Sequence, residues 1–155
     1  MHVIIRLLLI SIAWVAIQIG SGYLAHRLPA ALFASDAPLF RTRRWEQGGE
    51  VYARVFMIRH WKDALPEAGA MFRGGFAKRG LRDRSAEHLR RFVAETRRAE
   101  LSHWLPAVLS LTFFAWNPVN VAIWMPIIGF LGNAPFIIVQ RYIRPRLERL
   151  LEGAG

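Results

Sequence analysis

The chain has 155 residues, enough for one domain at most, and 54% of them are hydrophobic. Its 21 lysines and arginines outnumber its 11 acidic residues, which gives a formal charge of +10 at pH 7. The sequence contains no cysteine, which excludes disulfides, thiolate metal sites and a cysteine nucleophile. Because the apolar residues come in long blocks, a membrane explains both the apolar and the basic excess, and we expect no nucleic-acid partner.

The first apolar block, residues 3–25, predicts a transmembrane helix. Arg6 is its only charged residue, and its length matches the roughly 20 residues that cross a bilayer. The alternative is a cleaved signal peptide, which the charged start and the small residues near the end fit in part. The apolar run is long for a signal peptide, so we favour a retained helix with its N-terminus outside the cytoplasm.

Residues 26–98 are polar and basic, and we expect them to lie in the cytoplasm or at the membrane interface. Val51, Val55 and Ile58 recur at helical spacing, which is typical of a helix lying in the interface. Turn-forming residues between 66 and 75 then indicate a loop.

A helix is predicted from about Ala86, capped by Asp83 or Ser85, and it carries the string ETRRAELSHW at 95–104. On a helix, Glu100 and His103 are one turn apart, so their side chains can touch. A carboxylate beside an imidazole suits general-base removal of a proton from a hydroxyl.

The alternative to a catalytic site is an interfacial helix in which Glu100 pairs with a nearby arginine. Thr96 shares the face of Glu100, whereas Glu95 and Arg98 lie on the neighbouring face with Ser102. Ser102 diverges from His103, which argues against a local nucleophile–base pair.

A second apolar block, residues 104–139, is too long for one crossing. The string NPVN at 117–120 divides it, so we predict a hairpin of helices at about 101–116 and 119–140, followed by a basic tail at 141–155. The first of these helices is short, which leaves open a re-entrant hairpin. The positive-inside rule then places the basic regions in the cytoplasm.

Two further groups of residues are candidates for substrate binding. Asn133 lies within the apolar block and must find a hydrogen-bond partner there. Guanidiniums at the end of the block are suited to binding phosphates. The alternative is a simple basic segment that follows a membrane helix, which has the same composition. The first group comprises Asn133, Gln140, Arg141, Arg144 and Arg146. The second group comprises Arg59, Trp61 and Lys62, which could form either an interfacial anchor or a contact with a polar headgroup.

The sequence lacks other residue patterns that are typical of metal or cofactor sites. The five histidines are scattered without metal-ligand spacing, and there is no glycine-rich phosphate loop of recognised spacing. We therefore expect neither a metal nor another cofactor.

The chain resembles the bacterial glycosyl-4,4'-diaponeurosporenoate acyltransferases, small membrane enzymes that acylate the sugar of a glycosylated carotenoid. The resemblance rests on ETRRAELSHW at 95–104, on NAPFIIVQRYIRPRL at 133–147 and less strongly on RHWK at 59–62. It carries over Trp104, Pro135, Tyr142 and Pro145 together with the candidate residues of the two long motifs, but Ser102 departs from the family pattern.

The resemblance implies an all-α integral membrane acyltransferase of the bacterial inner membrane. The donor would be an acyl thioester of coenzyme A or of a carrier protein, and the acceptor a glycosylated isoprenoid or glycolipid. His103 would be the base, oriented by Glu100, and the arginines would hold the donor's phosphates. The rivals are a non-enzymatic scaffold beside a glycolipid-processing enzyme, and a secreted basic protein bound peripherally to anionic lipid or nucleic acid.

Overall fold

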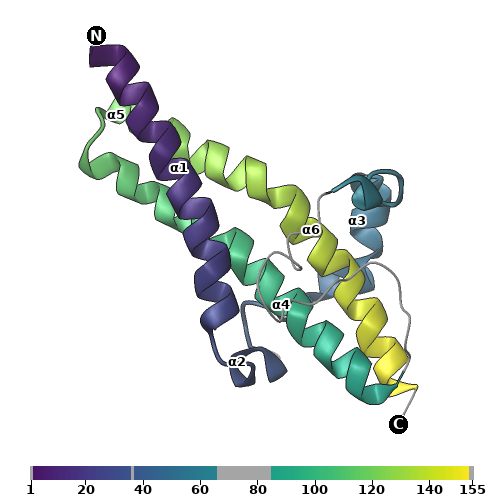
Figure 1. Ribbon diagram of the computed structural model, residues 1–155. Helices are drawn as coiled ribbons and strands as arrows, with labels where there is room; N and C mark the ends of the chain where they lie inside the picture. The colour runs from purple at the N-terminus through teal and green to yellow at the C-terminus, as the bar shows by residue number, and fades with distance from the viewer. Residues whose placement is uncertain (1, 36, 66–84, 154–155) are drawn as a thin grey trace.

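The computed structural model describes residues 2–35, 37–65 and 85–153, and every regular element in these ranges is a helix (Figure 1). The all-α prediction is therefore confirmed. The predicted loop at 66–75 and the candidate cap Asp83 lie outside the described residues.

The N-terminal helix α1 (His2–Arg27) covers the whole of the predicted apolar helix. Large apolar side chains face outward along it, including Val3, Leu8, Ile12 and Ile19. A helix that is apolar all round needs an apolar environment. By length and composition, α1 is one of two helices in the described chain that are able to cross a membrane, the other being residues 119–152.

Two long helices form the body of the molecule. Helix α4 (Ala86–Leu109) is capped by Ser85, whose hydroxyl accepts from the amide of His88 at 3.3 Å, and it continues into the 3₁₀ helix η4 (Ser110–Ala115). After a turn, the short α5 (Val119–Ala122) leads into α6 (Trp124–Glu152). The helix start and the turn lie where the sequence predicted them.

The hairpin is longer than predicted. The hairpin helix predicted from about residue 101 is continuous with the helix predicted from Ala86, and the residues expected to form a basic tail belong to α6 as far as Glu152. The reason is pairing between the charged halves: Arg97 Nη2 lies 3.1 Å from Glu148 Oε1, and Leu89, Phe92 and other apolar residues pack against Leu147. Local sequence does not reveal such a partner.

The middle region packs onto this hairpin through short helices: α2 (Ala31–Ala34), η1 (Arg44–Gly49), α3 (Glu50–Val55), η2 (Ile58–His60) and η3 (Lys62–Ala64). The predicted interfacial helix through 51–58 is wrong in part, because α3 ends at Val55 and Ile58 is completely buried with Tyr52 and Tyr142. Gly49 has a φ of 92°, and a side chain there would press on the backbone of Tyr142, so glycine permits this close approach.

The charges divide the molecule into two halves. Residues 7–25 and 105–139 contain no Asp, Glu, Lys or Arg. They lie together at one end of the molecule, where Trp14 of α1 packs on Phe113 of η4 with ring centroids 5.3 Å apart (Figure 1). The charged halves of α4 and α6 form the other end of the molecule, and the motif at 95–104 lies at the boundary between the uncharged and charged halves.

Candidate functional site

A buried ion-pair cluster occupies the charged side of this boundary. Glu100 is 0% exposed, and its two carboxylate oxygens accept from the guanidiniums of Arg141, at 2.8 Å, and Arg144. Trp104 Nε1 donates to Glu100 Oε1 at 3.2 Å. This matches the alternative in which Glu100 pairs with arginine, since each of its oxygens is engaged by a cation.

Further groups complete the cluster. Arg141 Nη1 donates to Glu46 Oε1 at 2.7 Å, and Arg144 Nε donates to Thr96 Oγ1 at 3.1 Å. Burial, and secondarily the Glu46 carboxylate, raises the pKa of Tyr52 to about 12. Charges buried this deeply are stable only when paired and hydrogen-bonded, which explains why these groups occur together.

The same arginines fix the chain segment before η1. Arg141 Nη2 donates to the carbonyl of Leu39 at 2.7 Å, and Arg144 Nη1 donates to that of Phe40 at 2.5 Å. Arg144 is 1% exposed, and all three of its nitrogens donate to protein groups. A phosphate could reach it only by breaking these bonds, so the geometry does not favour the predicted role of Arg144 in donor binding.

His103 lies one helical turn further towards the apolar end. Its Nδ1 is 2.9 Å from Asn133 Oδ1, and its ring stacks on Phe136 with centroids 4.5 Å apart. Asn133 Nδ2 donates to the Gly129 carbonyl at 2.8 Å, which fixes the orientation of the amide. Since the oxygen of Asn133 faces His103, Nδ1 carries the proton and the lone pair of the neutral ring is on Nε2.

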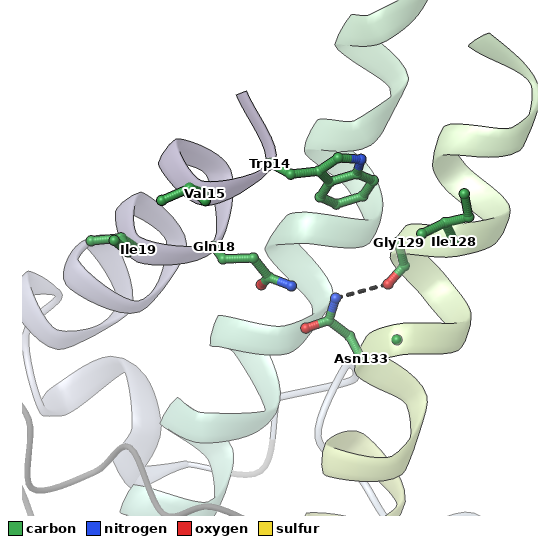
Figure 2. Close-up of a pocket in the computed structure, with 8 residues that line it drawn as sticks. Trp14, Val15, Gln18, Ile19, Ile128, Gly129 and Asn133 are labelled. Atoms are coloured by element: carbon green, nitrogen blue, oxygen red, sulfur yellow. Dashed lines mark hydrogen bonds between the residues drawn. The ribbon is translucent and has the colours of Figure 1, made fainter. Parts of the chain in front are cut away.

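Asn133 also lines a groove between α1 and α6, shown in Figure 2. The groove has a volume of about 460 Å³ and is partly open. Two of the lining side chains are amides, those of Gln18 and Asn133, and they point towards one another in Figure 2. The groove is therefore apolar except beside the residue that holds His103.

Other predicted site residues hold helix ends together. Arg98 Nη1 donates to the carbonyls of Ala25, His26 and Leu28 at 2.8, 2.9 and 3.1 Å. Its Nε lies 3.3 Å from Glu95 Oε1. Arg98 and Glu95 thus fasten the C-terminal end of α1 to α4.

The third motif packs on the outer side of α6. Arg146 Nη2 donates to Glu50 Oε1 at 2.6 Å, and Arg59 Nη2 donates to Glu50 Oε2 at 3.2 Å, so Glu50 joins two of the predicted motifs. Trp61 packs against the Tyr52–Tyr142 cluster, and Lys62 pairs with the neighbouring Asp63.

The structure thus separates the predicted residues into three groups. Thr96, Glu100, Arg141 and Arg144 form the buried cluster, and His103 and Asn133 form a pair. Gln140 is also buried. The remaining residues make contacts elsewhere: Glu95, Arg98, Arg146, Arg59, Trp61 and Lys62. Sequence reasoning missed Glu46, Phe136 and Gln18. Gln18 had a signal, because it is the only amide in the uncharged stretch 7–25.

Comparisons with known proteins decide the family. The model of the glycosyl-4,4'-diaponeurosporenoate acyltransferase family matches residues 36–153, which include all three motifs. The chain belongs to this family. It is accordingly an O-acyltransferase, and the resemblance predicted from the motifs is confirmed.

Curated relatives agree. Glycosyl-4,4'-diaponeurosporenoate acyltransferases from Staphylococcus aureus strains bovine RF122 / ET3-1, MRSA252 and USA300 are each 30% identical to this chain over 141 residues. These alignments cover 91% of this chain and 85% of each relative. No solved structure matches the chain.

Proposed function

We propose that this protein transfers a fatty acyl group from a thioester donor to a sugar hydroxyl of a glycosylated carotenoid or related glycolipid at the inner membrane surface. The observation that carries the proposal is the His103–Asn133 pair, which lies between a buried arginine cluster and an apolar groove. The name shared by the relatives supplies the acceptor class.

In this mechanism His103 is the general base. Nε2 takes the proton of the sugar hydroxyl as the hydroxyl oxygen attacks the thioester carbonyl carbon, which gives a tetrahedral intermediate. The intermediate collapses with cleavage of the carbon–sulfur bond, and the leaving thiolate recovers the proton from Nε2. One ester forms for each thioester broken, without a covalent enzyme intermediate.

Asn133 takes the orienting role first expected of Glu100. Its Oδ1 faces Nδ1 of His103 at 2.9 Å, and it stabilises the protonated ring as the proton arrives. The oxygens of Glu100 accept from arginines and from Trp104. We therefore assign Glu100 to holding α4 and α6 in register, which positions His103.

The donor is a thioester of coenzyme A or of a carrier protein, and its phosphates bind to the exposed arginines at the start of η1 and just before it. Arg43 lies at the end of the segment before η1 and Arg44 follows it as the first residue of η1; both are exposed. The backbone of the segment is anchored to the buried cluster at Leu39 and Phe40. Exposed guanidiniums can bind phosphate without breaking the core. The acceptor's sugar approaches from the same polar side.

Replacing His103 by Ala tests the proposal. Purified enzyme with acyl thioester and glycolipid should lose about 10²–10⁴-fold in kcat, the usual contribution of a general base. His88→Ala on the same helix is the matched control and should retain activity. Ester formation at the wild-type rate by the His103 variant would remove the base assignment, and no ester from the wild-type protein with any donor would remove the function.

A further inference from the structure

The groove between α1 and α6 begins at Asn133, the partner of the proposed base, and extends into the apolar half of the molecule. Asn133, which holds His103, lines one end, and Trp14 lines the other side of the same groove (Figure 2). The volume of about 460 Å³ lies within the usual range of ligand sites, about 300–1,000 Å³. The lining residues are Trp14, Val15, Gln18, Ile19, Ile128, Gly129, Gly132 and Asn133.

Two glycines of α6 shape the groove differently. A side chain at Gly129 would lie 2.8 Å from the Trp14 ring and 3.1 Å from Ser110 Oγ, so this glycine allows α1, η4 and α6 to pack closely. A side chain at Gly132 would meet nothing within 4 Å. Gly132 therefore keeps the groove open without being needed for packing.

Gln18 places an amide where the surrounding chain is apolar. The amide of Asn133 is occupied, since its oxygen faces His103 and its nitrogen donates to Gly129. Gln18 points towards it from α1 (Figure 2). Gln18 is exposed on α1 and lines the groove, so its amide is accessible to a ligand carbonyl beside Asn133.

We propose that this groove binds the acyl chain of the thioester donor. The thioester carbonyl lies at Gln18, and the chain runs past Gly132 towards Trp14. This inference rests on the proposed function and specifies which apolar part of the two substrates the groove takes.

The chemistry distinguishes the acyl chain from the acceptor's polyene. The acyl carbonyl carbon bonds directly to the oxygen that His103 activates, so the acyl chain starts at the reacting atoms. The polyene is separated from the reacting hydroxyl by the width of a sugar ring. A groove that begins at Asn133, in contact with His103, fits a chain that starts at the reacting carbon.

The test fills the groove at Gly132. Gly132→Leu is compared with Gly20→Leu, because both glycines lie in apolar helices and neither has an atom within 4 Å of an added side chain. Each variant is assayed with a series of thioesters from hexanoyl to stearoyl and one glycolipid acceptor. We expect Gly132→Leu to lose about tenfold or more in kcat/KM for long donors and little for hexanoyl, while Gly20→Leu keeps the wild-type profile.

Other outcomes overturn the inference while leaving the proposed function intact. An unchanged chain-length profile in an active Gly132→Leu enzyme would show that the groove does not hold the donor. An equal loss for all donors, restored by a short soluble glycoside acceptor, would assign the groove to the polyene. Gly132→Ala, the smallest change, gives the same readout in weaker form if the leucine variant is not recovered folded.

Gln18→Met tests the carbonyl end of the groove. Removal of a donor to the developing oxyanion should lower kcat about 100-fold for every chain length. This pattern differs from that of Gly132→Leu, which depends on chain length. Wild-type kcat in the methionine variant would exclude Gln18 from the carbonyl site.

Discussion

At the scale of single residues, the site depends on two hydrogen-bonding pairs of opposite character. The pair of His103 and Asn133 joins an imidazole to an amide, and Asn133 lines the groove, which suits a group that must accept and release a proton. Glu100 and Arg144 are buried and ionic, with exposures of 0% and 1%. Removing one partner of a buried ion pair leaves the other charge uncompensated, so the second pair is where folding is most sensitive.

Glu100→Gln should therefore destabilise the protein more than it changes the chemistry. The amide keeps the size and one acceptor but leaves Arg141 and Arg144 with one carboxylate fewer, for which we expect a loss of about 3–5 kcal/mol. Thermal unfolding in detergent measures this loss of stability. Glu87→Gln, on the first turn of the same helix, is the control.

The two roles of Glu100 predict different kinetics below the melting temperature. If Glu100 only holds α4 against α6, the folded fraction of the variant keeps kcat close to the wild-type value. A kcat lowered as far as in His103→Ala, with unchanged thermal stability, would restore Glu100 to the catalytic pair.

At the scale of helices, Arg98 positions α1 against the hairpin. Its three hydrogen bonds satisfy carbonyl groups at the end of α1 that would otherwise lack partners. The guanidinium also lies over the ring of Phe33, 4.7 Å from its centroid. Since one wall of the groove belongs to α1, this contact keeps the groove aligned with Asn133.

Arg98→Ala should loosen the end of α1. Bonds to a charged donor are worth about 1.5–3 kcal/mol, so thermal stability should fall measurably, and long-chain donors should lose more activity than short ones. Arg90→Ala, an exposed position on the same helix, is the control. An equal effect of both substitutions would indicate a general loss of positive charge and not the loss of a helix contact.

The sequence predicted the elements better than their partners. Apolar length predicted α1, Ser85 predicted the start of α4, and NPVN predicted the turn. The pairing of the charged halves was missed, because the contact between Glu100 and Arg144, 44 positions away, has no local signature. Asn133 was recognised as needing a partner, but only the fold identified His103.

At the scale of the whole molecule, a single boundary orders the site. On α1 the uncharged stretch ends at Ala25, on α4 it begins at Leu105, and on α6 it ends at Val139, so the three helices change from apolar to charged near the level of His103. A membrane surface at this boundary gives the sugar and the thiol access from water and the acyl chain access from lipid. We therefore propose that α1 and the apolar half of the hairpin are embedded in the inner membrane.

This arrangement predicts which positions are accessible from each side of the membrane. The chain has no cysteine, so single-cysteine variants carry no background label. Arg90→Cys, on the charged half, should react with a membrane-impermeant maleimide only after cells are permeabilised, because the positive-inside rule places that half in the cytoplasm. Val3→Cys, at the other end of α1, should react in intact spheroplasts, and labelling of Arg90→Cys from outside would reverse the orientation.

Asn120→Cys, in α5, distinguishes the two forms of the hairpin: labelling from outside indicates a full crossing, whereas protection on both sides indicates a hairpin that turns within the bilayer.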